Sequence, residues 1–257
     1  VHIDRRKDGR SIHLTQTGLI DRMIKALNIG DLPTKRTPAE YGCLGADKLG
    51  DPRQGTYSYP SVIGMAQYLQ GHTRPDITFS VSQCSRYAHS HKRSHEKALE
   101  RIGQYLKGTR DKGLILHPIH STDFKIDCYV DADFAGMWGC DDTDNPSCVK
   151  SKTGFVIFLM DCPVMWMSKL QTDIATSTME AEYNALSIAM REVIPLQHLT
   201  KDIIRGLGEL DKQVVLFRTT VHEDNTGALK LATMEPGRMT CLLYPSDAAD
   251  ESKGEHL

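Results

Sequence analysis

The spacing of hydrophobic residues predicts a largely helical first half of the chain. Apolar residues recur at intervals of three and four, the period of an amphipathic helix, within residues 19–27, 62–69 and 98–106. Gly30, Gly71 and Gly108 follow these stretches as stop signals, and Pro75 is placed to open a further helix. A short strand precedes the first helix, and residues 35–59 form a Pro- and Gly-rich connector with little periodicity.

The hydrophobic pattern changes near residue 120. Residues 124–130 alternate as a strand does, and residues 154–159 and 164–167 are two more apolar runs separated by a turn. A long helical stretch covers residues 178–205, in which Pro195 should end or kink the helix. A strand at 214–221 and a helix at 225–232 complete the order β-β-β-α-α-β-α. This order predicts an α/β (α+β) domain built on a mixed sheet.

Composition places the chain among ordinary globular proteins. Its 257 residues are 40% hydrophobic and 25% charged, which excludes a disordered chain and a collagen. No apolar run approaches the roughly 20 residues of a membrane span, and the first residues lack the apolar core of a signal peptide. Seven cysteines without a C-x-x-C pair indicate reduced thiols rather than a zinc site. We therefore expect an intracellular protein, in a cytoplasmic particle or the nucleus, that is not secreted and has no membrane partner.

The net charge of −2 hides an uneven distribution along the chain. Residues 1–118 carry 19 Lys and Arg against 11 Asp and Glu, whereas residues 119–257 carry 12 against 22. A basic half beside an acidic half suggests a polyanion-binding surface next to a carboxylate-rich site, although solvated faces of different charge are the alternative. The candidates for contacts with a nucleic-acid backbone are Lys92, Arg93, Lys97, Arg101 and Lys107.

Carboxylates gather where the predicted elements begin or end. Two pairs close strands and one pair lies in the first turn of the long helix: Asp131 and Asp133, Glu223 and Asp224, and Glu180 and Glu182. The helical pair is spaced by two, so only one of its members can face a given site. Carboxylates that converge from two strand ends and a helix can hold a pair of Mg²⁺ ions, since Mg²⁺ prefers hard oxygen ligands. Turn formation and helix-dipole stabilisation are the ordinary alternatives for each acid alone.

A strand-end Asp, a helical Glu-Tyr-x-Ala-Leu and a strand-end Asp-Asn follow one another in the order found in ribonuclease H. The flanking segments resemble the Pol polyprotein of copia-type retrotransposons in sequence and order, namely residues 129–136, 151–159, 166–169 and 177–186. Residues 73–82 and 98–109 resemble the segment that joins the reverse transcriptase to its ribonuclease H in that family. The resemblance covers residues 1–240, and its most specific part is residues 151–186.

The resemblance implies a site and a reaction. Asp131, Glu182 and Asp224 match the metal-binding acids of the family, which hydrolyses the RNA strand of RNA–DNA hybrids with two Mg²⁺ ions. The implied partners are the hybrid and the remainder of the reverse transcriptase. Between the third strand of the domain and the long helix, Ser168, Lys169 and Gln171 are candidate backbone contacts, with a polar turn as the alternative.

The resemblance also implies a division of the chain. Residues 1–118 correspond to the end of the reverse transcriptase and its helical connecting region, and residues 119–240 to an incomplete ribonuclease H-like domain with a mixed sheet. Residues 241–257 match nothing expected there, so we expect an unrelated, loosely packed or artefactual tail. The family's fourth acid is not matched, because no neighbouring pattern supports Asp247 or Asp250. We therefore expect a weak or inactive nuclease.

Other interpretations explain fewer features of the sequence. The main alternative is a non-catalytic nucleic-acid-binding or assembly remnant of the same fold, and an unrelated metal hydrolase would leave the upstream resemblance unexplained. Residues 129–133 resemble a polymerase motif, but Ala132 interrupts it and it follows the connecting helices, so no polymerase site is expected. His89, His91 and His95 lack a fourth ligand, which favours imidazoles that cap or flank a helix over a metal site.

Overall fold

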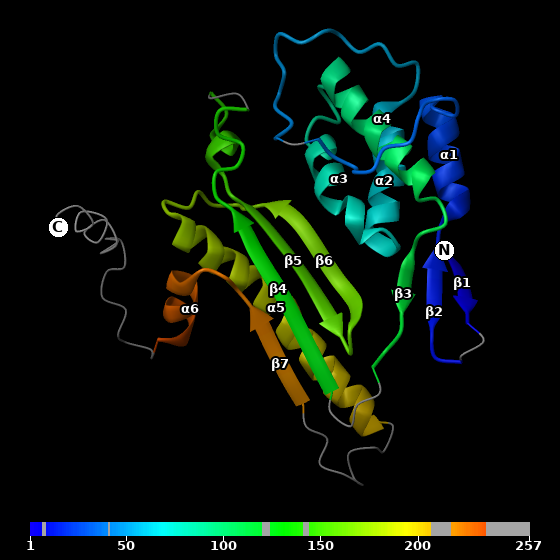
Figure 1. The fold of residues 1–257 in the computed structure, drawn as a ribbon. Coiled ribbons are helices and arrows are strands. Elements are labelled where there is room, and N and C mark those ends of the chain that lie inside the picture. Colours follow the sequence, from blue (N-terminus) through cyan, green and yellow to red (C-terminus); the bar gives the residue numbers. More distant parts are fainter. Residues whose placement is uncertain (7–8, 41, 120–123, 141–143, 207–216, 235–257) are drawn as a thin grey trace, which may run out of the picture.

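The computed structural model describes residues 1–6, 9–40, 42–119, 124–140, 144–206 and 217–234. Within these residues the protein has an α+β fold with two sheets, and the larger sheet is mixed, as the sequence predicts (Figure 1). The predicted tail at residues 241–257 lies outside the described residues. Among the described residues, none of the helices combines the length and apolar character that a bilayer crossing requires.

Four helices pack together in the first half of the chain. They are α1 (Thr17–Leu27), α2 (Tyr59–His72), α3 (Thr78–Ser85) and α4 (Arg93–Gly108), and the 3₁₀ turn η1 (Pro75–Ile77) leads into α3. Their buried faces form one hydrophobic cluster that includes Met23, Leu69, Ile77, Leu99 and Ile102. The helical periodicity of the sequence is therefore confirmed, and Pro75 opens the turn before α3.

A small antiparallel sheet flanks these helices. It has the order β1 (His2–Arg5), β2 (Ile12–Thr15) and β3 (Leu114–Leu116), so its third strand comes from about 100 residues further along the chain. The hydrophobic pattern predicts only one short strand before the first helix. Three-residue strands such as β3 leave too little alternation to be recognised without their partner.

The larger sheet has the strand order β6 (Cys162–Leu170), β5 (Lys152–Leu159), β4 (Phe124–Asp133) and β7 (Phe217–His222). β5 pairs antiparallel with both β6 and β4, whereas β7 pairs with β4 in parallel. The 3₁₀ turn η2 (Pro146–Val149) precedes β5, and α6 (Thr226–Thr233) follows β7. Residues 214–216 of the predicted last strand lie outside the described residues.

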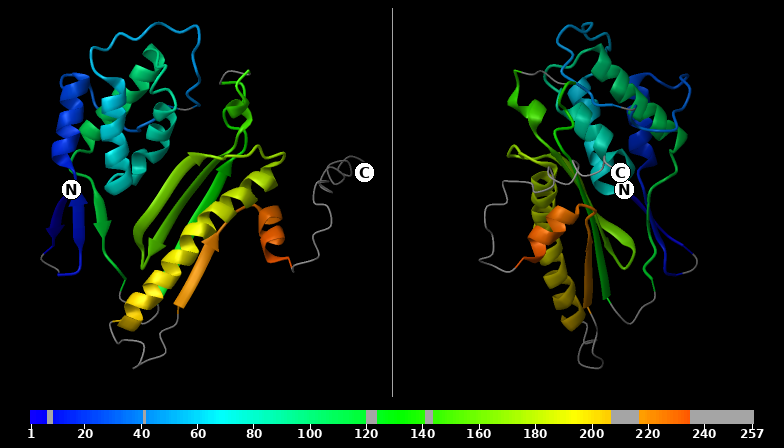
Figure 2. Two further views of the ribbon diagram at one scale, coloured as in Figure 1. Left: turned by 180° about the vertical axis from the view of Figure 1, so that it is seen from behind. Right: turned by 60° about the vertical axis from the view of Figure 1, so that its left-hand side comes forward.

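A single long helix, α5 (Thr178–Gly206), covers one face of this sheet, as Figure 2 shows from behind. Ala181, Ala185, Ala189 and Val193 pack from α5 onto the sheet in a second hydrophobic cluster. Of the two outcomes predicted at Pro195, an end or a kink, the structure excludes an end of the helix, because α5 continues through it. Val193 before the proline and Ile204 after it are both buried, so packing on either side offsets the lost main-chain hydrogen bond.

The two clusters lie on either side of residue 119, where the sequence analysis divides the chain; that division itself stays a prediction. Several contacts join the two parts. The indole of Trp166 on β6 bonds the main chain of α2 at Gln70, and the ammonium of Lys152 on β5 lies 4.4 Å from the centroid of the Phe79 ring on α3. The helical part therefore packs against β5 and β6, on the opposite side of the sheet from α5.

A disulfide between Cys43 and Cys140 also links the two parts. The expectation that all cysteines are reduced thiols is wrong for this pair. The two residues are 97 positions apart in sequence, and folding brings their Cα atoms to 6.2 Å, within the range of disulfides. Local spacing cannot reveal such a pair. Cys84, Cys128, Cys148 and Cys162 are free and buried.

Candidate metal centre

Strand directions bring three acids to one edge of the larger sheet. β4 and β7 are parallel neighbours, and Tyr129 pairs with His222. Asp131 comes two residues after Tyr129 and Asp224 two residues after His222, so the two aspartates lie side by side. Two antiparallel pairings give β6 the direction of β4, so the chain leaves β6 at this same edge and enters α5 there. Glu182 lies in the second turn of that helix.

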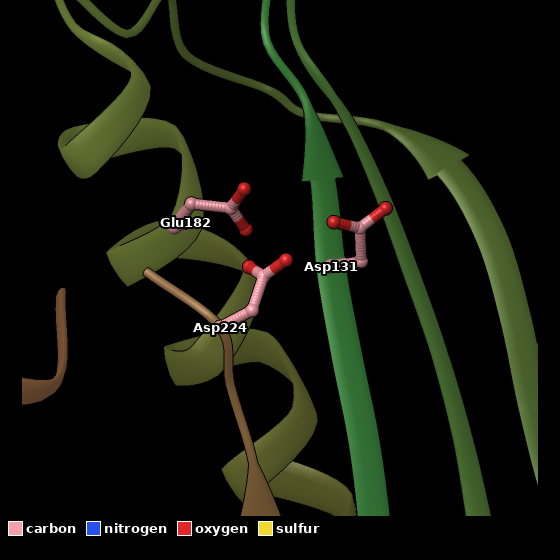
Figure 3. A group of neighbouring side chains, drawn as sticks. All are labelled: Asp131, Glu182 and Asp224. Carbon is pink, nitrogen blue, oxygen red and sulfur yellow. The ribbon is translucent and has the colours of Figure 1, made fainter. Parts of the chain in front are cut away.

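The three carboxylates face one another (Figure 3). One carboxylate oxygen from each of Asp131, Glu182 and Asp224 lies within 4.8 Å of the corresponding atoms of the other two, and this is the one such group of possible metal ligands among the described residues. Asp131 and Asp224 are exposed, whereas the Glu182 residue is only 4% exposed. The arrangement has a solvent-facing side, formed by two aspartates, and a closed side, formed by the glutamate.

Burial shapes the electrostatics of Glu182. Desolvation, reinforced by the charges of Glu223 and Asp131, raises the pKa of its carboxyl to about 7, although a backbone hydrogen bond from Ala132 acts the other way. Its Oε2 atom is buried and accepts no hydrogen bond within the described part of the chain. A buried carboxylate oxygen without a partner is unfavourable, and a cation or a proton would satisfy it. The donor set and this unpartnered oxygen both fit a hard divalent cation.

The neighbouring acids at the same edge are directed elsewhere. Glu180 accepts hydrogen bonds from the main-chain N–H and the hydroxyl of Thr176, at 2.7 and 2.6 Å, so its carboxylate stabilises the start of α5. These bonds hold the pKa of Glu180 below its ordinary value. The Asp133 carboxylate packs against Gly136, where a Cβ atom would lie 1.9 Å from Oδ2. Of the helical pair, Glu182 faces the site, which settles the choice that the two-residue spacing leaves open.

A fourth carboxylate, that of Glu223, lies next to the acid triad. Desolvation raises the pKa of Glu223, and the charges of Asp224 and Asp131 add to this effect. Glu223 is one of the acids predicted at a strand end, but the sequence predicts no role for it. Its position directly before Asp224, in the turn between β7 and α6, is the only sequence signal for it.

The candidate nucleic-acid contacts on α4 are mostly engaged within the protein. Arg93 pairs with Glu96 and Glu100, Arg101 pairs with Glu40, and the Lys107 ammonium donates to the main-chain oxygens of Gly30 and Leu32. Lys97 is exposed and Lys92 is half-buried at the start of the helix. The structure leaves Lys97 as the most available cation of this group.

The candidate nucleic-acid contacts near β6 lie in other positions than the sequence predicts. Ser168 and Lys169 lie within β6 rather than between a strand and a helix. Gln171 is buried at 4% exposure, and its amide donates to the Thr153 hydroxyl and the Ala181 carbonyl, at 3.0 and 2.9 Å. The prediction of Gln171 as a backbone contact is therefore wrong, because its side chain points into the protein. Lys169 is exposed.

Two histidines of the cluster at residues 89–95, His91 and His95, make their contacts within the helical part of the chain. His95 is fully buried, accepts from the Lys92 main-chain N–H at 2.7 Å and contacts the Gly45 carbonyl oxygen through Nε2 at 2.8 Å. His91 stacks on Tyr59 with ring centroids 4.3 Å apart. The interpretation of His95 as a helix-capping imidazole is confirmed.

Comparison with known proteins shows which proteins this chain resembles. The chain is similar to retrovirus-related Pol polyproteins from transposons, which supports a fragment of such a polyprotein. It is 35% identical over 146 residues to the Pol polyprotein from transposon RE2 of Arabidopsis thaliana, a match that covers 57% of this chain and 9% of that protein. It is 31% identical over 222 residues to the Pol polyprotein from transposon TNT 1-94 of Nicotiana tabacum, covering 84% of this chain and 16% of that protein.

A third relative is much shorter. The chain is 34% identical over 143 residues to a protein of Plasmopara viticola named secreted RxLR effector protein 161, covering 56% of this chain and 94% of that protein. No family model and no solved structure matches the chain. The chain thus corresponds to a small part of the length of the two polyproteins.

Proposed function

We propose that Asp131, Glu182 and Asp224 hold Mg²⁺ and that the domain around them hydrolyses the RNA strand of RNA–DNA hybrids. The single observation that carries this proposal is the convergence of three carboxylates within 4.8 Å, one of them buried with an unpartnered oxygen. The similarity to Pol polyproteins supports it.

The charge of the site requires a cation before a nucleic acid can approach. Three carboxylates without a counter-ion repel a phosphodiester, whereas hard divalent cations reverse the local charge. When bound, Mg²⁺ supplies an activated water and stabilises the leaving oxygen of the phosphodiester. Asp131 and Asp224 are exposed and stand on the side from which a backbone phosphate arrives, while the buried Glu182 holds its carboxylate in a fixed orientation.

The RNA strand would be distinguished by its 2′-hydroxyl groups, which act as both donors and acceptors. Lys97 on α4 and Lys169 on β6 are exposed, and in this proposal they would contact backbone phosphates without reading the sequence. The remainder of the reverse transcriptase would complete the surface that carries the hybrid.

A hybrid-cleavage assay tests the proposal. A duplex with a labelled RNA strand is incubated with the full chain and Mg²⁺, beside the variants Asp131→Asn and Asp133→Asn. Even slow cleavage supports the proposal if Asp131→Asn abolishes it, if Asp133→Asn keeps it and if chelation by EDTA stops it. Cleavage that survives Asp131→Asn contradicts the site.

The second candidate function is hybrid binding without cleavage. The excess of Lys and Arg over Asp and Glu in residues 1–118, which favours contact with a polyanion whether or not the acids act, supports it. In the same experiment this alternative predicts that the hybrid binds the chain, in a salt-dependent way, and that the RNA strand stays intact at every Mg²⁺ concentration.

A further inference from the structure

A cavity of about 350 Å³ lies in the helical part, between α3, α4 and the segment that joins α1 to α2. Leu44, Ala98 and Ile102 give it an apolar side, and all three belong to the first hydrophobic cluster or pack against it. A mostly apolar cavity of this size with a few polar groups is typical of sites for small organic molecules. The acid triad is not part of its lining, so the inference stands apart from the proposed function.

The segment that joins α1 to α2 has no helix or strand among its described residues, yet it is held in place beside the cavity. The main-chain N–H of Leu44 donates to the Gln83 side chain at 2.8 Å, and the Leu44 carbonyl accepts from the Tyr87 hydroxyl at 2.9 Å. One residue earlier, Cys43 forms the disulfide with Cys140. The wall of the cavity is therefore preformed, and a ligand would not have to order this segment when it binds.

One side of α4 supplies hydrogen-bond donors that lack acceptors. Ser94, Lys97 and Arg101 all line the cavity, and their spacing of three and four places them on the same side of the helix. The Ser94 hydroxyl and the Arg101 Nε are buried and have no hydrogen-bond partner in the described part of the chain. The ion pairs that the structure describes on α4 involve Arg93 and Arg101 but not Lys97. Buried donors without an acceptor are unfavourable, so an acceptor from outside the chain would stabilise this side of α4.

The charges around the cavity indicate the class of ligand. Arg101 donates to the Glu40 carboxylate through Nη1 at 2.7 Å and to the Thr37 hydroxyl through Nη2 at 3.0 Å, so its charge is compensated. The lining thus has two positive groups, Lys97 and Arg101, against one negative group, Glu40, and one positive charge remains. One such charge beside an apolar wall suits a single carboxylate on an apolar body. A phosphomonoester carries close to two negative charges and would be only partly neutralised here.

We propose that this cavity binds a small monocarboxylate with an apolar body. The Lys97 ammonium supplies the opposite charge, and the Ser94 hydroxyl and the Arg101 Nε–H supply hydrogen bonds to the carboxylate oxygens. The apolar body lies against Leu44 and Ala98. Burial of the apolar body and pairing of the carboxylate both contribute, so neither a neutral apolar molecule nor a bare inorganic anion should bind as well.

Calorimetry with three probes that share one alkyl chain tests the inference. Octanoate, octan-1-ol and octylammonium are titrated separately into the full chain at pH 7.5 and low salt. We expect one octanoate per chain, bound about tenfold more tightly than octan-1-ol, because a hydrogen-bonded charge contributes about that much to affinity. Octylammonium should bind more weakly than octan-1-ol, since its charge is repelled by Lys97.

Three variants locate the site. Lys97→Met keeps an unbranched side chain and removes its charge, so it should lower the affinity for octanoate to about that for octan-1-ol and leave octan-1-ol binding unchanged. The matched control Lys25→Met, at an exposed position of α1 outside the cavity, should bind like the unmodified chain. Ala98→Leu fills part of the cavity and should weaken octanoate and octan-1-ol alike.

Several results would overturn the inference. Equal affinities for octanoate and octan-1-ol would do so, as would no binding of octanoate, or a Lys97→Met protein that binds octanoate as before. Octylammonium that binds as tightly as octanoate would show that only the alkyl chain is recognised. Hybrid cleavage and its loss in Asp131→Asn are measured independently of these titrations, so a failure of the proposed function is distinct from a failure here. Circular dichroism of each variant establishes that lost binding does not reflect a lost fold.

Discussion

The indole N–H of Trp166 donates a hydrogen bond of 2.7 Å to the main-chain oxygen of Gln70. The two residues are 96 positions apart, and the bond joins β6 of the larger sheet to α2 of the helical part. This bond connects the two parts of the chain, so its removal should lower the free energy of unfolding by a measurable amount.

Trp166→Phe should lower the free energy of unfolding by about 1–3 kcal/mol, because it leaves the Gln70 carbonyl without its partner and shortens an aromatic side chain at the contact. Trp138, the other tryptophan of the sequence, is 63% exposed and provides the matched control. Urea unfolding of both variants checks the prediction. Equal midpoints for Trp166→Phe and Trp138→Phe would show that the bond contributes nothing.

Gln171→Leu should destabilise the chain by about 1–3 kcal/mol, whereas Lys169→Ala should change stability by less than about 0.5 kcal/mol. Gln171 bridges the hydroxyl of Thr153 on β5 and the carbonyl of Ala181 at the start of α5, and Lys169 is exposed. Thermal unfolding measures both variants. The affinity of each variant for an RNA–DNA hybrid is measured as well. If Lys169 contacts a phosphate, Lys169→Ala should reduce this affinity and Gln171→Leu should not.

The cations of α4 should divide into two groups when hybrid binding is measured against salt concentration. Lys97→Ala should reduce the slope of log K against log salt by about one, the signature of one lost phosphate contact. Arg101→Ala should leave that slope unchanged and lower stability, because the Arg101 guanidinium is held by Glu40 and Thr37. A reduced slope for Arg101→Ala would mean that its ion pair opens for the nucleic acid.

The stability of the metal-free chain should fall as the pH rises from about 4.5 to about 7. Burial raises the pKa of Glu182 to about 7 from an ordinary 4.5, so in this interval the folded chain holds a proton that the unfolded chain has lost. The slope contributed by this group is at most about 1.4 kcal/mol per pH unit. Glu182→Gln should flatten it, and Mn²⁺ should restore stability at pH 7.5 in the unmodified chain only. The midpoints of urea unfolding, measured between pH 5 and 8 for the unmodified chain and for Glu182→Gln, test the prediction.

Lys152→Met should stabilise the protein at pH 7 by about 1 kcal/mol. Lys152 is 5% exposed, and desolvation together with the charge of Arg86 lowers the pKa of its ammonium to about 8. Between pH 8 and 10.5 the unfolded chain binds more protons at this residue, so the unmodified protein should gain stability with pH there. Lys152→Met should lack this gain, and the exposed control Lys169→Met should retain it. Chemical unfolding at pH 7 and 9.5 compares the three proteins.

The helices could be predicted from sequence because apolar spacing is a local property, and this spacing identifies α1, α2 and α4. The acid triad is predicted from the resemblance to the Pol family, and Asp131 lies within β4, two residues before the end of the strand. What could not be predicted depends on distant partners. Leu114–Leu116 forms a strand only through Ile12–Leu14, and the inward direction of Gln171 depends on the Thr153 hydroxyl.

The acids of the site differ in the kind of information that locates them. Glu182 could be distinguished from Glu180 only through the family pattern, and the structure supplies the physical reason, since Thr176 occupies the Glu180 carboxylate. Glu223 carries no pattern of its own. Pro195 illustrates the reverse case, in which the helix continues through a proline because the residues on both sides of it, Val193 and Ile204, are buried.

The parallel pairing of β7 with β4 has a consequence for how the site comes into being during synthesis. Asp131 emerges from the ribosome first, Glu182 about 50 residues later, and Glu223 and Asp224 after a further 40. β7 is the edge strand of the described sheet, so a nascent chain can assemble β4, β5, β6 and α5 before it arrives. Such a folding intermediate already has most of its core but only two of the three carboxylates of the acid triad. Metal binding by ribosome-bound chains of increasing length would therefore begin abruptly, when the turn after His222 has left the exit tunnel.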